Sequence, residues 1–228
     1  MPNLFYVWGD LRSSETLQEL PSDIDAAYYL VHSMSEIVSS LVDAESLAVA
    51  QFIRHLQATN VKQIIYLGGI VDEEDRLSPH LRSRLFVENA LRSGGLPLTT
   101  LRASIIIGSG SASFEIIRDL CEKLPVMVAP KWVGTLCQPI AIRDAIFYLS
   151  HVLLDERCYG RVFDIGGPDI LTFKEMLLRF AKHKRLKRWI IEVPVLTPRL
   201  SSYWLVFITS VKFSLCKYLV ESMKYPSV

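Results

Sequence analysis

The stretch VKQIIYLGGI (residues 61–70) is a short apolar run that ends in two glycines. Segments of helical periodicity lie on both sides of it: one runs from Leu41 to Thr59, and another begins at Ser78. Short apolar runs that alternate with such helices are typical of a parallel sheet covered on both faces. The stretch therefore predicts a strand of a doubly wound α/β fold.

The rest of the chain repeats this alternation. Further strands are predicted at LFYVWG (4–9), AAYYLVHS (26–33), LTTLRASIIIG (98–108) and RVFDIGG (161–167), with helices near 112–123 and 143–154. Thr172 and Glu175 form a capping-box pattern that predicts one more helix. The proline-bearing stretches KLPVMVAP (123–130) and EVPVLTPRL (192–200) are expected to be loops that border a smaller second lobe.

Composition and charge limit the function classes. The 228 residues are 50% hydrophobic, which is enough for one well-buried core. The 25 basic and 24 acidic residues give a net charge of +1 and look evenly spread, so a nucleic-acid partner is not expected. The four cysteines lack metal-ligand spacing and are expected to be buried thiols, with no metal site. The first residues do not form a secretory signal, so a cytoplasmic location is expected.

The stretch LSPHLRSRLFVENAL (77–91) carries two polar residues of interest. Ser78 is a good N-cap, which places His80 in the first helical turn and Arg84 one turn later, on the face that also holds Val87. A histidine there is able to act as a general acid or base near neutral pH, with the arginine as a hydrogen-bond donor. The alternative is a packed histidine beside a solvated arginine, and spacing alone leaves both open.

Seven stretches together carry a family resemblance: GDLRSSETL, DAAYYLVHSM, VKQIIYLGGI, residues 77–120, QPIAIRD, RVFDIGGPDILTFKEML and VPVLTPRLSSYW. The chain resembles, over nearly its whole length, the atypical short-chain dehydrogenase/reductase family. It is most similar to NmrA-like, NAD(P)-binding members that are also described as nucleoside-diphosphate-sugar epimerase-like. The resemblance implies a Rossmann-like sheet in residues 1–124 and a C-terminal substrate lobe in residues 125–228, with 139–166 returning to the sheet.

The resemblance also implies site residues. The family's Tyr-x-x-x-Lys pair falls on His80 and Arg84, which become the expected catalytic residues, while the family's catalytic Ser or Thr falls on Gly68 or Gly69. The expected NAD or NADP contacts stand at the carboxyl ends of strands: Asp10, Leu11, Leu30, Val31, His32, Ser33, Gly68, Gly69, Ala103, Ser104 and Ile105. For Asp10, a turn-forming or helix-capping role is an equal alternative.

The sequence departs from the family in its glycines. Family members open with a strand, a Gly-x-x-Gly-x-x-Gly turn and a helix, whereas Met1 here stands almost at the third strand, so an N-terminally shortened sheet and weak or absent NAD(P) binding are expected. Residues 4–9 would then pair with the next strand or remain unpaired, and the exposed edge would favour a homodimer or aggregation. Gly108 and Gly110 imitate the missing turn but are expected to form a strand-to-helix turn near the nicotinamide or substrate.

The segment from Thr197 and Pro198 onward predicts an amphipathic helix. It is expected either to pack on the substrate lobe or to dock at a membrane surface or a partner, and Lys212 and Lys217 argue against a transmembrane span. Three functions remain open: a reductase- or epimerase-like enzyme on an unknown small molecule, a non-catalytic dinucleotide-sensing or scaffold protein, and a shortened member that no longer binds cofactor.

Overall fold

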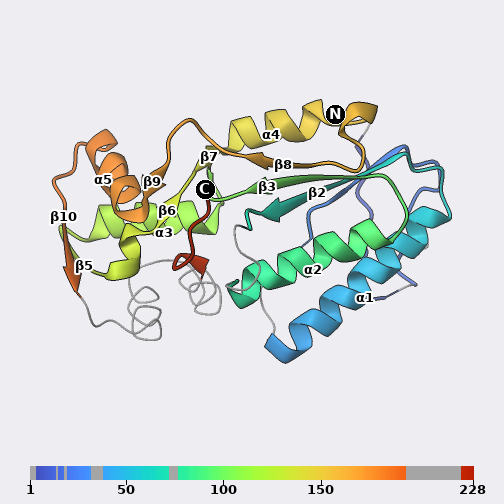
Figure 1. Cartoon of the computed structure of the whole chain (residues 1–228), viewed down its shortest axis with the longest axis horizontal. Coiled ribbons are helices and arrows are strands. Elements are labelled where there is room, and N and C mark those ends of the chain that lie inside the picture. Colours follow the sequence, from blue (N-terminus) through green and yellow to red (C-terminus); the bar gives the residue numbers. More distant parts are fainter. Residues whose placement is uncertain (1–3, 14, 18–19, 32–37, 72–76, 194–221) are drawn as a thin grey trace. The chain divides into compact units, whose positions relative to one another are not determined.

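The chain folds into two compact units, each assembled from separate pieces of sequence (Figure 1). The computed structural model describes residues 4–13, 15–17, 20–31, 38–71, 77–193 and 222–228. Unit 1 comprises Met1–Gly68, Ser83–Leu101 and Leu149–Phe163, and unit 2 comprises Gly69–Arg82, Arg102–Tyr148 and Asp164–Val228. The boundary predicted after residue 124 stays a prediction, because a functional region and a compact unit are different divisions of a chain.

The main sheet has the strand order β1-β2-β3-β8. Its strands are β1 (Ala26–Tyr29), β2 (Gln63–Gly69), β3 (Leu98–Ala103) and β8 (Val162–Ile165). β1 and β2 are parallel. The Ile64 N–H donates to the Pro97 carbonyl and the Ile70 N–H to the Ala103 carbonyl, so β2 and β3 advance in the same direction. The predicted pairing of QIIYLGG with both neighbouring strands is confirmed, and the fold is a mixed α/β fold with a parallel sheet.

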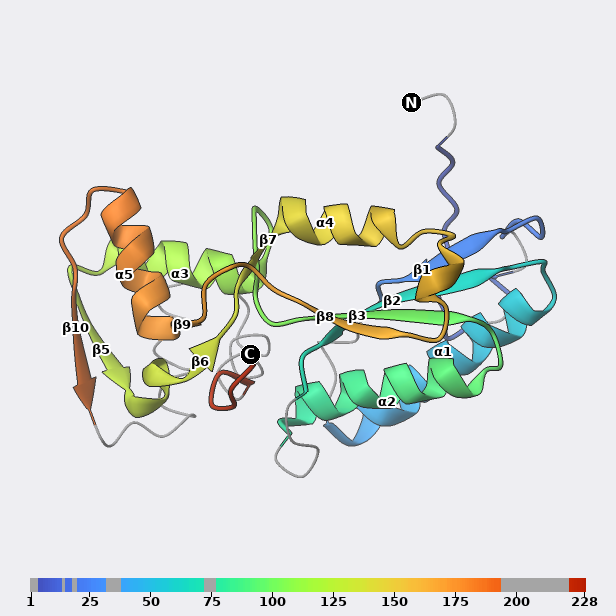
Figure 2. The same cartoon turned by 45° about the horizontal axis from the view of Figure 1, so that its top comes forward.

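Two helices lie side by side on one face of this sheet (Figures 1 and 2). They are α1 (Val38–Gln57) and α2 (Pro79–Ser93), close to the predicted bounds. The side chains that they bury meet those of β1, β2 and β3 in one core of unit 1: Tyr29, Val49, Leu56, Val61, Ile64, Tyr66, Val87, Leu91 and Leu98. Residue 78 caps α2 as predicted, because the Ser78 hydroxyl accepts a hydrogen bond from the Leu81 N–H at 3.2 Å.

Unit 2 has its own core around two helices, α3 (Ala112–Lys123) and α5 (Phe173–His183). The predicted capping box of α5 is present in both directions between Thr172 and Glu175. The remaining elements are β4 (Ile106–Ile107) paired with β7 (Ile140–Ala141), β6 (Leu136–Cys137) paired with β9 (Leu171–Thr172), α4 (Ile142–His151), η2 (Lys131–Gly134) and η3 (Glu156–Cys158). The predicted strand at 98–108 is thus two strands, because β3 ends at Ala103 and β4 pairs elsewhere.

The prediction of a strand at residues 4–9 is wrong. Residues 4–10 have no regular secondary structure, and the side chains of Phe5, Tyr6 and Trp8 are 85%, 90% and 93% exposed. A strand needs a neighbour to satisfy its backbone groups, and within the described part of the chain β1 pairs only with β2. β-propensity alone therefore did not make this segment a strand.

The prediction of loops at the two proline-bearing stretches is also wrong where the structure describes them. Val126–Pro130 is β5, and it pairs in parallel with β10 (Trp189–Val193). Met127 is buried, while Val126 and Val128 on either side of it are exposed, which is the alternation of a strand with one covered face. Residues 194–200 and the expected C-terminal helix lie outside the described residues. No helix in the described ranges is long and apolar enough to cross a membrane.

Candidate functional site

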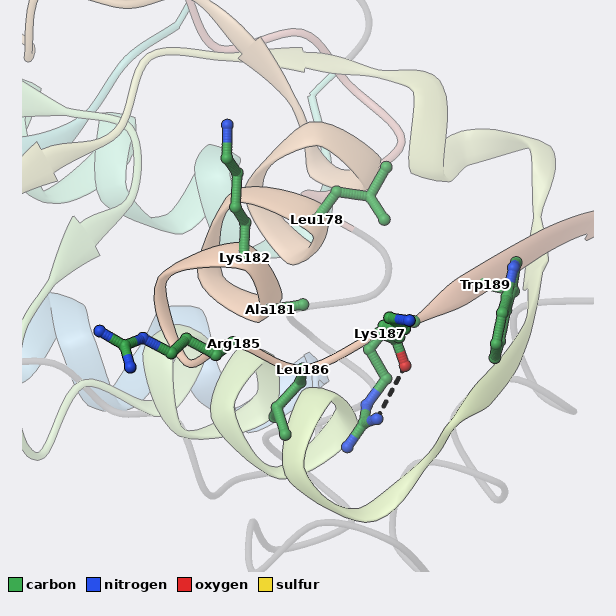
Figure 3. Close-up of a pocket in the computed structure, with 8 residues that line it drawn as sticks. Leu178, Ala181, Lys182, Arg185, Leu186, Lys187 and Trp189 are labelled. Atoms are coloured by element: carbon green, nitrogen blue, oxygen red, sulfur yellow. Dashed lines mark hydrogen bonds between the residues drawn. The ribbon is translucent and has the colours of Figure 1, made fainter.

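An open hollow of about 520 Å³ lies in unit 2, where α5 ends and β10 begins (Figure 3). Its lining includes Leu178, Lys182, Arg185, Leu186, Lys187 and Trp189. None of these is a predicted site residue, and the sequence analysis missed them because it judged charge over the whole chain. The run KHKRLKR (182–188) holds five lysines and arginines without an acidic residue, and a local count would have found it.

The predicted catalytic helix is attached to the end of β2 through Arg84. The Arg84 Nη1 donates a hydrogen bond to the Leu67 carbonyl at 3.1 Å, and the Tyr66 hydroxyl donates to the Arg84 carbonyl, also at 3.1 Å. Leu67 directly precedes Gly68 in the strand. A permanent cation therefore stands at the carboxyl end of a central parallel strand, which is the edge where open α/β sheets bind ligands.

The ring of Tyr66 occupies the space beside Gly68. A Cβ atom added at Gly68 would lie 3.0 Å from the Tyr66 Cε1, which is closer than ordinary van der Waals contact. A serine at this position, as in the family triad, would press its Cβ against the ring. Burial raises the pKa of Tyr66 to about 12, so its hydroxyl remains a hydrogen-bond donor at neutral pH.

A buried carboxylate lies behind this helix. The Ser83 hydroxyl on α2 donates to Glu45 on α1, and both side chains are buried within unit 1. Burial raises the pKa of Tyr29, and the nearby Glu45 charge adds to this increase. The sequence analysis missed the pair, although Glu45 stands at helical spacing with Ala48 and Phe52 on the apolar stripe of α1.

His80 is half-buried in the first turn of α2, in the part of the helix that belongs to unit 2. Gly69 belongs to the same unit, whereas Arg84 and Gly68 belong to unit 1. The contact of Arg84 with the strand end lies within unit 1, and the catalytic roles of His80 and Arg84 both stay predictions.

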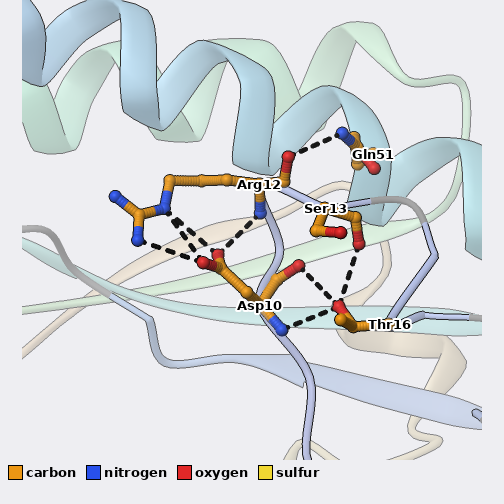
Figure 4. Close-up of polar contacts among 5 residues, drawn as sticks. All are labelled: Asp10, Arg12, Ser13, Thr16 and Gln51. Atoms are coloured by element: carbon orange, nitrogen blue, oxygen red, sulfur yellow. Dashed lines mark hydrogen bonds and ion pairs between the residues drawn. The ribbon is translucent and has the colours of Figure 1, made fainter.

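Asp10 forms a local turn with the residues that follow it (Figure 4). Its carboxylate accepts hydrogen bonds from the backbone N–H and the guanidinium of Arg12, and its backbone N–H donates to the Thr16 hydroxyl. The Arg12 hydrogen bonds hold the pKa of Asp10 below its usual range. This arrangement is the turn-forming alternative, and a contact of Asp10 or Leu11 with a cofactor stays a prediction.

The remaining strand-end residues have varied surroundings. Leu30 and Val31, just after β1, are exposed, while His32 and Ser33 lie outside the described residues. Within unit 2, Ala103 is buried. The Ser104 hydroxyl is hydrogen-bonded to that of Ser227 at 2.6 Å, and the Ile105 carbonyl accepts from the Ile140 N–H. Their predicted contacts with a dinucleotide stay predictions.

The two glycines that imitate a phosphate-binding turn have separate structural reasons, which are close packing at Gly108 and a left-handed backbone at Gly110. A Cβ added at Gly108 would lie 2.5 Å from the Ile142 Cγ2, so this glycine allows the Ile142 side chain to approach the backbone. Gly110 has a φ of +82°, and Ser111 is the N-cap of α3. The predicted strand-to-helix turn is confirmed, and no phosphate contact is needed to explain its glycines.

The side chain of Gln63 is fully buried in unit 1 and has a partner for each end of its amide. Its Nε2 donates to the Thr99 hydroxyl and to the Val152 carbonyl, both at 2.8 Å, and its Oε1 accepts from the Leu154 N–H. The role is structural: one amide joins β2, β3 and the segment after α4. One sign of this role is visible in the sequence, because Gln63 is a polar residue within the apolar run 61–70.

Three of the four cysteines lie in the described part of the chain, and Cys216 lies outside it. Burial raises the pKa of the Cys121 thiol to about 11 and that of Cys137 to about 12, while Cys158 is half-buried. The buried thiols of Cys121 and Cys137 are therefore protonated at neutral pH, as expected for structural cysteines. Across the described ranges, no group of three or more His, Cys, Asp or Glu side chains is placed to hold a metal ion.

Comparison with known proteins gives similar structures only. No family model and no curated protein matches the sequence. The NADP(H) complex of triphenylmethane reductase from Citrobacter sp. is 17% identical, with a TM-score of 0.71, over 95% of this chain and 72% of that one. A nucleoside-diphosphate-sugar epimerase from Staphylococcus aureus is 12% identical, with a TM-score of 0.72, over 94% and 72%.

A third similar structure is RMD from Pseudomonas aeruginosa complexed with NADPH. It is 14% identical, with a TM-score of 0.66, over 94% of this chain and 87% of that one. Identities this low establish a shared fold and leave the reaction open. The resemblance inferred from the sequence is thus confirmed at the level of the fold.

Proposed function

We propose, on the basis of a fold shared with nicotinamide-dependent reductases and sugar epimerases, that this chain is an NAD(P)-binding protein with reductase- or epimerase-like activity on a small molecule. The contact between the Arg84 guanidinium and the Leu67 carbonyl carries the proposal. It places a permanent donor group at the carboxyl end of β2, the edge at which this class of sheet binds its ligands. NAD and NADP are both compatible with this argument.

In this proposal, His80 transfers the proton and Arg84 is a positioning residue. An imidazole titrates near neutral pH and is therefore able to give and accept a proton in one cycle. The Arg84 guanidinium attaches α2 to the end of β2 within unit 1. A bound nicotinamide dinucleotide would supply hydride transfer. Its expected contacts are the strand-end residues Asp10, Leu11, Leu30, Val31, His32, Ser33, Gly68, Gly69, Ala103, Ser104 and Ile105.

The fit of the cofactor is partial. The Asp10 carboxylate already binds Arg12, and Gly108 already packs against Ile142. Gly108 and Gly110, which imitate a phosphate-binding turn, are accounted for by packing and by backbone conformation. We therefore expect a dissociation constant weaker than about 1 μM, because the pyrophosphate contacts supply much of the affinity in this fold.

Calorimetric titration of the 228-residue chain with NADH and NADPH tests the proposal. We expect weak, saturable binding that Arg84→Ala reduces further. The matched control is Arg82→Ala, which removes an exposed guanidinium from the same helix. No heat of binding at millimolar nucleotide would argue against the proposal, and equal effects of the two variants would remove Arg84 from it.

A non-catalytic, dinucleotide-sensing protein is the second candidate. The crowding between Gly68 and the Tyr66 ring favours it, because the family's catalytic hydroxyl cannot be added there without a shift of the ring. Incubation of the chain with NADPH and a panel of carbonyl compounds and sugar nucleotides separates the candidates. Binding without any turnover across the panel would favour the sensing role.

A further inference from the structure

The turn between α5 and β10 carries positive charge that is only partly compensated. Lys184 lies 3.7 Å from the Glu122 carboxylate, and the Arg188 guanidinium donates to the backbone carbonyls of Cys121, Glu122 and Lys187. These contacts attach the turn to the C-terminal end of α3. Two of the five basic side chains in 182–188, those of Lys184 and Arg188, therefore have a structural role.

The other three basic residues are among those that line the hollow, and the side chains of Lys182 and Arg185 extend outward from it (Figure 3). Lys182, Arg185 and Lys187 form no ion pair with any residue that the structure describes. Arg185 has a φ of +57° and closes α5, since its N–H donates to the Lys182 carbonyl. The local fold therefore holds three cations near the turn that have no ion-pair partner among the described residues.

An exposed apolar sheet face adjoins this charge through Trp189. The parallel register places Trp189 opposite Val126, and Ile191 opposite Val128. These four side chains are 60%, 46%, 52% and 43% exposed in that order. On the other face of the same strands, Met127 and Ile190 pack into the core of unit 2. The outer face of β5 and β10 is thus apolar along its length and has a tryptophan beside the basic turn.

We propose that the outer face of β5 and β10, together with Lys182, Arg185 and Lys187, docks on an anionic lipid bilayer. Apolar side chains that enter the boundary between headgroups and acyl chains, with lysines and arginines around them, are the combination that binds such surfaces. Tryptophan is favoured at this boundary because its ring is apolar and its N–H is polar. This surface differs from the C-terminal segment and from the β1 edge.

Two other occupants fit less well. Sites for small ligands enclose most of the ligand surface, whereas this hollow is open and borders the exposed face of β10 at Trp189. A twofold dimer would set this face against its own copy, which carries the same three cations and offers Lys182, Arg185 and Lys187 no opposite charge. An anionic surface matches both the charge and the flat apolar area.

Vesicle sedimentation with the 228-residue chain tests the proposal. We expect binding to phosphatidylcholine vesicles that contain phosphatidylserine, little binding to pure phosphatidylcholine, and a decrease with added salt. Each basic side chain near a charged bilayer contributes a factor of about five. The double variant Lys182→Gln, Lys187→Gln should therefore lower the partition coefficient by roughly 25-fold. Trp189→Ser should lower it on both vesicle types.

Matched controls distinguish binding through this surface from an effect of the chain's total charge or hydrophobicity on vesicle binding. The double variant Lys62→Gln, Arg143→Gln removes two exposed cations elsewhere, and Phe147→Ser removes an exposed aromatic ring from α4. Both controls should leave vesicle binding within about twofold of the parent chain. Circular dichroism melts of all variants verify folding.

Several results would overturn the proposal. They are no sedimentation with anionic vesicles, equal sedimentation with neutral ones, or a loss in the controls as large as in the test variants. A chain that sediments alone as a dimer, and becomes monomeric in Trp189→Ser without any vesicle binding, would assign the face to self-association instead.

Discussion

The guanidinium of Arg84 and the backbone carbonyl of Leu67 are 3.1 Å apart, joined by a hydrogen bond between α2 and the end of β2. Hydrogen bonds to charged groups contribute about 1.5–3 kcal/mol to stability. We expect Arg84→Ala to lower the free energy of unfolding of unit 1 by about 2 kcal/mol in urea titrations. Arg82→Ala, on the exposed side of the same helix, should change it by less than about 0.5 kcal/mol. Equal changes would contradict a specific role for this contact.

Restoring the family's hydroxyl at Gly68 should destabilise the fold. In Gly68→Ser the new Cβ would lie 3.0 Å from the Tyr66 ring, and overpacking of this kind costs about 1–3 kcal/mol. The control is Gly134→Ser, because a Cβ at Gly134 meets nothing within 4 Å. Thermal unfolding monitored by circular dichroism measures both. A Gly68→Ser variant as stable as the parent would show that the Tyr66 ring moves aside freely, and would weaken the case for a non-catalytic role.

The capping box of α5 should make stability depend on pH in the acid range. Hydrogen bonds from the backbone N–H and hydroxyl of Thr172 lower the pKa of Glu175 below its value of 4.5 in an unfolded chain. A group whose pKa is depressed by folding stabilises the fold above its unfolded pKa, and this contribution is lost as the pH falls through the folded value. The parent chain should therefore exceed Glu175→Gln in stability at pH 7, with a difference that shrinks below pH 4.5.

A double-mutant comparison checks the cause of this dependence. Thr172→Ala removes the hydroxyl but leaves the backbone N–H that also donates to Glu175, so in this background Glu175→Gln should change the slope of stability against pH less than it does in the parent chain. Urea titrations at several acidic pH values measure the slopes. A change in slope as large as that in the parent chain would show that the Thr172 hydroxyl contributes nothing, and a parent slope that Glu175→Gln leaves unchanged would assign the effect to another carboxylate.

His80→Ala tests the proposed chemistry. If the imidazole transfers the proton, the variant should lower turnover by roughly 10²- to 10⁴-fold for any substrate found in the carbonyl and sugar-nucleotide panel. In the pH profile of the remaining activity, the part that arises from titration of the histidine should be absent. An unchanged rate, with nucleotide binding intact, would leave His80 a packing residue.

The strands and helices that were predicted well are those whose local pattern agrees with their surroundings. The apolar run at 63–69 is buried on both sides, and Ser78 and Thr172 both cap the helices that they announce. Segment 4–9 has the composition of a strand, but a strand forms only where a neighbouring strand is available to pair with it. Composition alone does not show whether such a neighbour exists. At 126–130 the prolines suggested a loop, whereas Pro130 only ends a strand whose pairing partner lies some sixty residues later.

The candidate site was harder to predict because it depends on which atoms the ends of the side chains contact. Spacing placed Arg84 on the inward stripe of its helix, yet only coordinates show that it donates to a backbone carbonyl. The burial of Glu45 with Ser83 depends on how two helices meet, which a single periodic pattern does not define. The basic turn at 182–188 was visible in the sequence and was hidden by a charge averaged over 228 residues.

The amide of Gln63 has a consequence for synthesis of the chain on the ribosome. The hydrogen-bond partners of this amide belong to residues 99, 152 and 154. The last segment of unit 1 is therefore unable to pack in place until residue 154 has left the ribosomal exit tunnel. Nascent chains that end before this point leave the amide without those partners and are prone to bind chaperones or aggregate. Unit 1 is therefore committed to folding late in translation, although its first strand is made early.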